Sequence, residues 1–312
     1  MQKKFLAVIA SCAFVLECMH GSSVAENLRY FMQPESVTVS SVPYGDNANA
    51  GHYVQADDAR IYYEVYGDGK PVFVFHGGGV GFAYEMGQFI DALRNDYKVV
   101  SVSTRGHGHS EIGKNPLSFE QKANDMFAVM REVTDQPAII IGFSDGAYTA
   151  YKVAAMYPES VERVIAIGAG SLRKGFFHGE MPLSALEATD KIFIAQQKAI
   201  RPEPERWQEF LNDYMKFWEN MEVNAELFGQ IYCPVLLIAG DEDDHAPVAT
   251  VLEAHQSIKN SRLFIVPNSW HDAFHENFAL VWDVVKPFIY TELGDLKPSS
   301  KVDYNNQFKF AE

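Results

Sequence analysis

The segment Gly142–Gly146 reads Gly-Phe-Ser-Asp-Gly and lies between an apolar run, Ala138–Ile141, and a helical pattern, Ala147–Tyr157. A serine at a sharp turn between a strand and a helix has a strained backbone that pushes its hydroxyl out above the sheet. Flanking glycines let the strand and the helix approach closely, and the positive end of the helix favours developing negative charge. Ser144 is therefore the predicted nucleophile of an acyl-transfer reaction.

A second glycine-rich segment, His76–Gly81, directly follows the apolar run Pro71–Phe75. Acyl transfer to serine forms a tetrahedral oxyanion, which needs two N–H donors. One donor is expected from the residue after the nucleophile, Asp145, and the other from a loop like this one, where absent side chains let the backbone approach a substrate carbonyl. Gly78 is the preferred second donor, and Gly79, the next choice, is expected to contact substrate. A plain flexible turn is the weaker interpretation.

A serine nucleophile needs a base, and the base needs an orienting acid. His271 follows the apolar run Leu263–Val266 and is the preferred base, ahead of His107, His109, His245 and His275. The run Val235–Ala239 ends in a loop with four carboxylates, which are Asp241, Glu242, Asp243 and Asp244. The order serine, acid, histidine along the chain is the order used by one class of serine hydrolase. Position alone leaves open which of these carboxylates is the acid.

The elements that must position these residues alternate between short apolar strands and amphipathic helices. After a plausible opening hairpin at 52–66, strands are expected at 71–75, 98–102, 138–141, 164–167, 235–239 and 263–266, with helices near 83–94, 119–134, 145–157, 248–258 and 275–290. Continuous apolar strands indicate a parallel sheet that is covered on both faces. The repetition predicts an α/β fold with right-handed crossovers, whose active site lies at the carboxyl ends of the strands.

Residues 171–230 interrupt this alternation, because they contain no strand-like run. They are rich in aromatic residues and have helical spacing from Glu205 to Glu222. The segment is either a helical insertion that buries its own aromatics or a cap over the active site, and both can hold. We expect Trp207 and Trp218 to contact substrate. The expected organisation is an extended lead-in at 26–50, a core at 51–170 and 231–293, the cap at 171–230 and a tail at 294–312.

The 312-residue chain is 47% hydrophobic and carries a net charge of −15 that is spread along the sequence. Such a surface repels nucleic acid and anionic membranes, so a small-molecule partner is expected. Lys3, Lys4 and the apolar run Phe5–Leu16, followed by Ser23-Val24-Ala25, predict a signal peptide over residues 1–25 and a periplasmic or secreted enzyme without stable membrane association. An uncleaved anchor or a lipoprotein at Cys12 are the alternatives. The mature chain then keeps one cysteine, Cys233, so it forms no intramolecular disulfide.

The chain from about Gly51 to Tyr290 resembles the α/β-hydrolases, and within them the valacyclovir hydrolase-like esterases. The matching segments are His76–Gly78, Arg105–Ser110, Gly142–Gly146, Gly240-x-x-Asp243 with Pro247, and His271 with Glu276. The resemblance implies a mostly parallel sheet with a helical cap after the sixth strand, and it selects Asp243 as the acid. Two residues before Arg105-Gly106 the family often has aspartate, whereas this chain has Ser103. This difference is expected to affect the support of the loop and not the chemistry. The resemblance also implies that Asp145 binds a substrate ammonium; helix capping or a local ion pair is the alternative.

These observations predict a hydrolase of small or medium carboxylic esters that works through an acyl-serine without metal or cofactor. Its catalytic residues are Ser144, His271 and Asp243, and its oxyanion donors are Gly78 and Asp145. A carbon–carbon bond hydrolase or an aminopeptidase with the same triad is the nearest alternative. A catalytically silent binding protein on the same scaffold is the alternative from another class.

Overall fold

The computed structural model describes residues 28–296, so the predicted signal peptide and most of the C-terminal tail lie outside the described residues. One sheet of eight strands runs in the order β1-β2-β4-β3-β5-β6-β7-β8. Its strands are β1 (Gly51–Ala56), β2 (Ala59–Tyr66), β3 (Pro71–Phe75), β4 (Lys98–Val102), β5 (Ala138–Phe143), β6 (Val161–Ile167), β7 (Val235–Gly240) and β8 (Ser261–Val266).

The helices alternate with these strands along most of the chain. They are α1 (Gly87–Leu93), α2 (Phe119–Val133), α3 (Asp145–Met156), α4 (Leu183–Thr189), α5 (Lys191–Ile200), α6 (Trp207–Asn220), α7 (Ala225–Phe228), α8 (Val248–Ser257), α9 (Ala273–Glu276) and α10 (Phe278–Tyr290). Short 3-10 helices are η1 (Ala83–Met86), η2 (Pro158–Ser160), η3 (Pro204–Arg206) and η4 (Leu293–Asp295).

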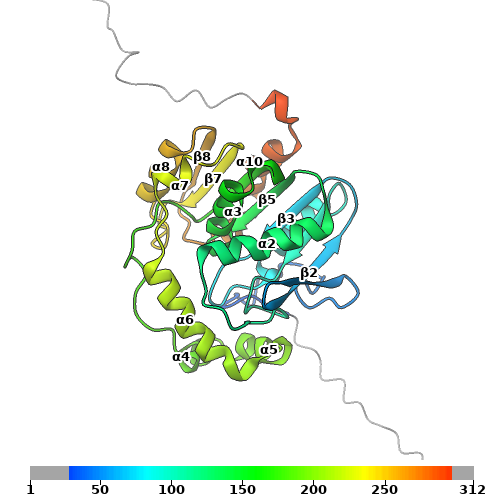
Figure 1. The fold of residues 1–312 in the computed structure, drawn as a ribbon, viewed down its shortest axis with the longest axis vertical. Coiled ribbons are helices and arrows are strands. Elements are labelled where there is room, and N and C mark those ends of the chain that lie inside the picture. The colour runs from blue at the N-terminus through cyan, green and yellow to red at the C-terminus, as the bar shows by residue number, and fades with distance from the viewer. Residues whose placement is uncertain (1–27, 297–312) are drawn as a thin grey trace, which may run out of the picture.

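Strands β3 to β8 pair in parallel, whereas β1 and β2 form an antiparallel hairpin that joins the sheet through β4. The central strands β3 and β5 are buried along their whole length, as expected for a sheet covered on both faces. Helices α2 and α3 lie in front of the sheet in Figure 1, and α10 lies behind it. The α/β-hydrolase fold predicted from the sequence is confirmed.

The segment between β6 and β7 forms a group of helices, α4 to α7, of which α4, α5 and α6 lie together beside the core in Figure 1. Asp190 caps α5, since its Oδ1 accepts the N–H of Phe193 at 3.1 Å. The inward face of α6 is built from aromatic and aliphatic residues at helical spacing, which are Trp207, Phe210, Leu211, Tyr214 and Trp218. This segment therefore buries its own aromatics and also faces the core.

The lead-in before β1 forms a series of turns that are anchored on the sheet. Tyr44 is fully buried, and its hydroxyl donates to Asp91 Oδ1 at 2.7 Å. Buried Glu64 on β2 accepts the N–H groups of Gly45 and Asn47, each at 2.7 Å. These bonds fix the direction in which the lead-in approaches the carboxyl ends of the strands.

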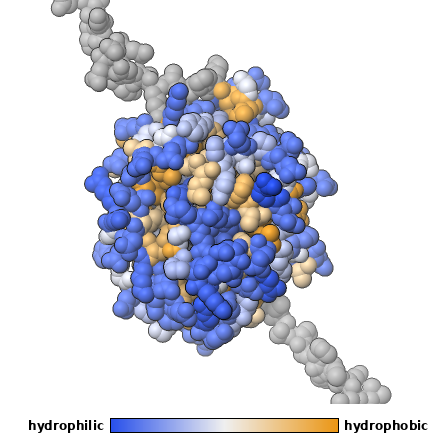
Figure 2. Space-filling view, viewed as in Figure 1, coloured by the Kyte–Doolittle hydropathy of each residue, from blue (hydrophilic) through white to orange (hydrophobic). Residues whose placement is uncertain are grey.

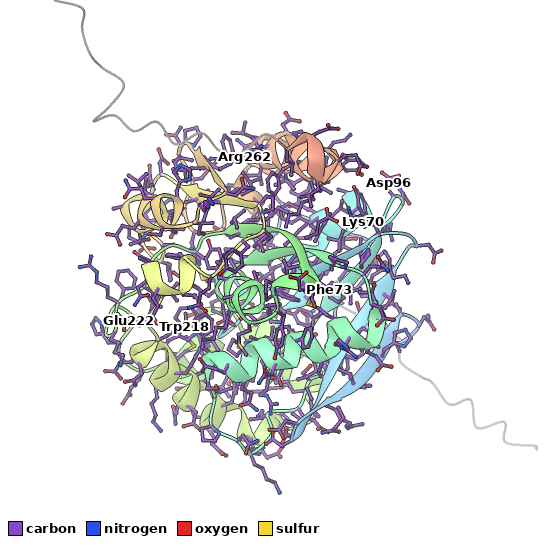
Figure 3. The ribbon with its side chains drawn as sticks, turned by 45° about the horizontal axis from the view of Figure 1, so that its top comes forward. Lys70, Phe73, Asp96, Trp218, Glu222 and Arg262 are labelled. Carbon is purple, nitrogen blue, oxygen red and sulfur yellow. The ribbon has the colours of Figure 1, made fainter. Side chains whose placement is uncertain are left out.

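The surface visible in Figure 2 is mostly hydrophilic, and its apolar residues lie in small separate groups. Within residues 28–296, no helix has both the length and the apolar character that crossing a bilayer requires. Inside the molecule, Phe73 lies in the central sheet and Trp218 lies near the end of α6, as labelled in Figure 3.

Candidate active site

Ser144 stands between β5 and α3 with φ 50° and ψ −117°, a left-handed conformation that is rare for a residue with a side chain. A Cβ on Gly142 would lie 2.5 Å from the carbonyl oxygen of Gly146, and a Cβ on Gly146 would lie 2.5 Å from that of Phe75. Both positions therefore require glycine. The tight packing holds the serine in its strained turn and directs its hydroxyl above the sheet.

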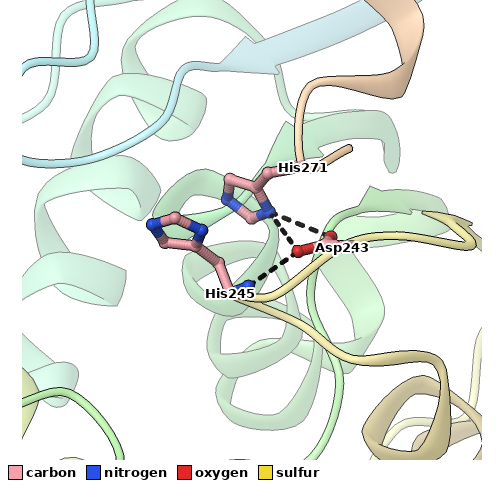
Figure 4. A group of neighbouring side chains, drawn as sticks. All are labelled: Asp243, His245 and His271. Carbon is pink, nitrogen blue, oxygen red and sulfur yellow. Dashed lines mark hydrogen bonds and ion pairs between the residues drawn. The ribbon is translucent and has the colours of Figure 1, made fainter. Parts of the chain in front are cut away.

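His271 lies on the loop after β8, and its ring faces the carboxylate of Asp243 (Figure 4). Its Nε2 is 2.9 Å from Ser144 Oγ, and its Nδ1 is 3.0 Å from each carboxylate oxygen of Asp243. A proton on Nδ1 that is donated to the carboxylate leaves Nε2 free to accept the serine proton. The three residues thus have the geometry of a serine–histidine–aspartate relay.

The other aspartates of the β7 loop bond elsewhere. Asp241 Oδ1 accepts the N–H of Ser269 at 3.2 Å, and Asp244 Oδ1 lies 2.7 Å from His245 Nδ1. Of the carboxylates on this loop, the one that hydrogen-bonds His271 is that of Asp243.

Asp243 is buried and its carboxylate is well satisfied. Its Oδ1 accepts the N–H groups of His245 at 2.9 Å and Ala246 at 2.8 Å. Burial alone would raise the pKa of Asp243, but the hydrogen bonds and charge from His271, with those two N–H groups, outweigh it and hold the pKa below its usual value. The carboxylate is therefore ionised at neutral pH, as an acid that stabilises an imidazolium requires.

The glycine loop after β3 is held from below by His76 and Glu85. His76 Nε2 accepts the N–H of Thr104 at 3.0 Å, so its Nδ1 donates to the Gly77 carbonyl at 2.6 Å. Burial lowers the pKa of His76 to about 3, which keeps the ring neutral. Gly77 N–H donates to Glu85 Oε1 at 2.5 Å. With the Gly77 N–H engaged, the next donors along the loop belong to Gly78 and Gly79.

Gly78 lies directly under the cap. A Cβ there would be 1.5 Å from the hydroxyl oxygen of Tyr214 on α6 and 2.8 Å from Cβ of Asp145. The Asp145 N–H belongs to the first turn of α3, where backbone donors have no intrahelical partner. The two expected oxyanion donors therefore come from neighbouring residues at the carboxyl ends of β3 and β5.

Glu85 gives a pH-dependent prediction, because burial raises its pKa to about 7 from an ordinary 4.5. Between those values the folded protein binds a proton that the unfolded chain has released, so the free energy of unfolding decreases as pH rises through this window. Glu85→Gln keeps an oxygen that can accept the Gly77 N–H and has no charge to bury. We expect the Tm of the wild type to fall more steeply than that of Glu85→Gln between pH 5 and 8. Parallel Tm curves for the two proteins would contradict this.

A cavity of about 450 Å³ opens above Ser144 and His271. Of the residues expected to contact substrate, Gly79 and Trp218 line it, as does the expected oxyanion donor Gly78. Most of the other lining residues had no site role predicted from the sequence. These other residues are Tyr30, Phe31, Gly77, Val80, Gly81, Glu85, Phe143, Phe177, Met181, Tyr214, Met215, His245, Asp272 and His275. Its walls are thus mainly aromatic and aliphatic. The position of Phe143 beside the nucleophile in the sequence and the aromatic residues of the cap indicated that they could line the site. Nothing in the sequence of the lead-in indicated that Tyr30 or Phe31 reaches the cavity.

Trp207 does not line this cavity, so the expectation that it contacts substrate is wrong. It is fully buried under the guanidinium of Arg201, which lies 3.9 Å from the centre of its ring. Trp207 and Trp218 share one face of α6, but eleven residues separate them by roughly 16 Å along the helix axis. The helix is long enough that only its C-terminal half covers the site.

Asp145 has a partner within the protein. Its Oδ2 is 2.6 Å from Lys122 Nζ, and the two side chains are 1% and 4% exposed. The Lys122 ammonium also lies 5.6 Å from the ring centre of Tyr214. Asp145 does not line the cavity, and its charge is already compensated. The structure therefore supports the local ion pair over the binding of a substrate ammonium.

This pairing leads to a second prediction. Asp145→Asn leaves Lys122 buried without a counter-charge, a change that typically costs about 3–5 kcal/mol. We expect a lower Tm and an equal fall in kcat/KM for an amino-acid ester and for p-nitrophenyl butyrate, measured side by side at one pH. As a control, Lys122→Met combined with Asp145→Asn should recover part of the lost Tm. A loss confined to the amino-acid ester, tenfold or more, would restore the ammonium-binding role.

His245 contributes a second imidazole beside the base. Its ring stacks on that of His271, with centroids 4.7 Å apart and 23° between the planes (Figure 4). Ligand atoms of Asp243, His245 and His271 lie within 4.8 Å of one another. A metal ion there would take His271 away from Asp243 and Ser144, so we assign Asp243 and His271 to the relay and not to a metal site.

Comparisons with known proteins agree with this architecture. A family model described as the alpha/beta hydrolase fold matches residues 70–195. The AB hydrolase superfamily protein YisY of Bacillus subtilis is 24% identical over 270 residues, which cover 76% of this chain and 98% of YisY. The human serine hydrolase BPHL is 24% identical over 246 residues, covering 72% of this chain and 81% of BPHL.

A solved structure with the same fold is the meta-cleavage product hydrolase of Pseudomonas fluorescens. It superimposes with a TM-score of 0.66 at 20% sequence identity, covering 78% of this chain and 98% of that chain. The resemblance predicted from the motifs is confirmed by these matches.

Proposed function

We propose that this chain, which has the α/β-hydrolase fold, is an enzyme that hydrolyses small or medium carboxylic esters through an acyl-serine intermediate. Ser144 is the nucleophile, His271 the base and Asp243 the orienting acid. One observation carries the proposal: His271 Nε2 lies 2.9 Å from Ser144 Oγ while its Nδ1 lies 3.0 Å from Asp243. A serine hydroxyl needs this arrangement to lose its proton at the moment it attacks.

In the first half-reaction, Ser144 Oγ bonds to the ester carbonyl carbon as its proton passes to His271 Nε2. Asp243 stabilises the imidazolium, and the N–H groups of Asp145 and Gly78 hold the oxyanion. When the tetrahedral intermediate collapses, the bond to the alcohol oxygen breaks and the alcohol takes the proton from His271. The acyl group stays on Ser144.

In the second half-reaction, His271 accepts a proton from water while the water oxygen bonds to the acyl carbon. The bond to Ser144 Oγ then breaks, the carboxylic acid leaves and the proton returns to the serine. Every proton moves through one imidazole, so the reaction requires no external acid or base. The helix α3 supplies its positive end to the oxyanion in both halves.

The lining of the cavity supports a neutral, apolar substrate. Aromatic and aliphatic side chains dominate the walls, and Asp145, the expected ammonium binder, is paired with Lys122. A volume of about 450 Å³ suits a ligand of small to medium size. We therefore favour a neutral acyl or aryl ester over an amino-acid ester.

A substrate panel tests the proposal. p-Nitrophenyl esters, amino-acid esters and aryl amides should be compared by kcat/KM, with p-nitrophenyl esters of short to medium chains expected to be fastest. Faster hydrolysis of the amides would indicate an aminopeptidase. If the protein hydrolysed a vinylogous 1,5-diketone and none of the esters, it would be the carbon–carbon bond hydrolase, which uses the same triad. A protein that turns over no substrate and reacts with no fluorophosphonate would be the silent binding protein.

A further inference from the structure

Two aromatic residues of the cavity come from the lead-in, more than a hundred positions before the nucleophile. Tyr30 and Phe31 line the same cavity as Ser144 and His271. Tyr30 is 7% exposed, and Phe31 is half-buried. Because these residues precede the first strand, the wall they form is separate from both the sheet loops and the cap. We call the segment 29–33 the strap.

The strap is attached to the cap through Asp190, the residue that caps α5. The N–H of Met32 donates to Asp190 Oδ2 at 2.8 Å, and Arg29 Nη2 lies 3.3 Å from the same oxygen. Phe31 packs edge-on against Phe193 of α5, with ring centroids 5.5 Å apart. One carboxylate thus holds both the first turn of a cap helix and the backbone of the strap.

The strap is also attached to the core, next to the loop that carries the base. The Tyr30 ring stacks on His275 of α9 at 4.1 Å between centroids, with 16° between the planes. His275 Nε2 in turn donates to the backbone carbonyl of Glu85 at 2.8 Å. Tyr30 therefore rests on a side chain that connects α9, just after His271, with the helix that follows the glycine loop.

The turn of the strap has its own internal bonds. Gln33 Oε1 accepts the N–H of Tyr30 at 3.0 Å, and Arg29 donates to the Gln33 carbonyl at 2.6 Å. Met32 takes a left-handed φ of 59°, which turns its side chain outward, where it is 63% exposed. The segment consequently presents two aromatic rings inward and one methionine outward, from a backbone held by hydrogen bonds at Tyr30, Met32 and Gln33.

We propose that the strap sets the size of the apolar group that the active site accepts, with Phe31 as a specificity-determining residue. This inference rests on the proposed ester-hydrolase function. Phe31 suits the role because it bridges the cavity and α5 without being part of the fully buried core. A smaller side chain there lengthens the cavity, and a larger one shortens it. Apolar groups gain affinity for each methylene that they bury, so the effect grows with chain length.

The test compares Phe31→Ala, Phe31→Trp and the wild type on p-nitrophenyl butyrate and p-nitrophenyl octanoate. The ratio of kcat/KM for octanoate over butyrate should rise roughly tenfold in Phe31→Ala, as expected from about two further buried methylenes. The same ratio should fall in Phe31→Trp. General damage to the site would not move the ratio in opposite directions in the two variants, so opposite shifts identify pocket size as the cause. Met32→Ala is the matched control: it changes the same strap, keeps the N–H donated to Asp190, and should leave the ratio unchanged.

Labelling rates with a short-chain and a long-chain alkyl fluorophosphonate give the same ratio without ester turnover. If the wild type is labelled and the ratios of both Phe31 variants lie within twofold of the wild-type ratio, only the role of the strap is overturned. Equal shifts in Phe31→Ala and Met32→Ala would overturn it too. A wild type that neither reacts with the probes nor hydrolyses the esters would overturn the proposed function instead, and this inference with it.

Discussion

Replacing Ser144 by alanine should lower kcat for ester hydrolysis by at least about three orders of magnitude. The Oγ atom forms the bond to the substrate, and its proton is the one that His271, at 2.9 Å, is placed to accept. Alanine keeps the backbone N–H of Asp145 and removes a hydroxyl whose partner in the structure is the imidazole. The comparison is of steady-state kcat for p-nitrophenyl butyrate in the purified wild type and variant.

Folding must be checked in parallel, because Ser144 occupies a left-handed conformation with φ 50°. Alanine and serine are similarly strained there, so we expect Tm to change little. A Ser144→Ala protein with an unchanged Tm and activity near that of the wild type would contradict the mechanism. Such a result would require a different nucleophile in the same cavity.

Replacing Asp243 by asparagine should cost on the order of 10⁴ in kcat, the loss known for the same change in a protease triad. The Asn oxygen can still accept the N–H groups of His245 and Ala246, now bonded to Oδ1. Its amide group then faces His271 Nδ1 and donates to it. The imidazole is driven to the tautomer with its proton on Nε2, which cannot accept the proton of Ser144.

Asp241→Asn and Asp244→Asn are the matched controls, since they remove a carboxylate from the same loop. Asp241 bonds Ser269 and Asp244 bonds His245, and neither bonds His271. Both variants should retain most of the wild-type kcat. If either control were the crippled protein while Asp243→Asn stayed active, the assignment of the acid would be wrong.

The fold could be predicted from sequence because its strands are apolar along their whole length. The run Ala138–Ile141 and its neighbours could only be buried in a sheet covered on both faces, and the glycines of 142–146 could only serve a tight turn. Asp243 required more than position, since four carboxylates share its loop; the G-x-x-D spacing selected it.

The sequence did not predict which side chains contact each other across the core. Lys122 lies on the amphipathic helix α2, where a lysine ordinarily faces solvent, and only the tertiary packing buries it against Asp145. Tyr30 and Phe31 belong to a segment without periodicity, so no pattern indicated that they reach the cavity. Trp207 and Trp218 share a helix face, and the sequence does not reveal which end of that face covers the site.

The most direct test of the catalytic assignment is to identify the residue that a fluorophosphonate modifies. The wild-type protein should be labelled at neutral pH, digested and mapped by tandem mass spectrometry, with Ser144→Ala treated alongside it. We expect one phosphonylated site, at Ser144, and no labelling of the variant. An adduct on another residue, or equal labelling of the variant, would contradict the assignment of Ser144 as the nucleophile.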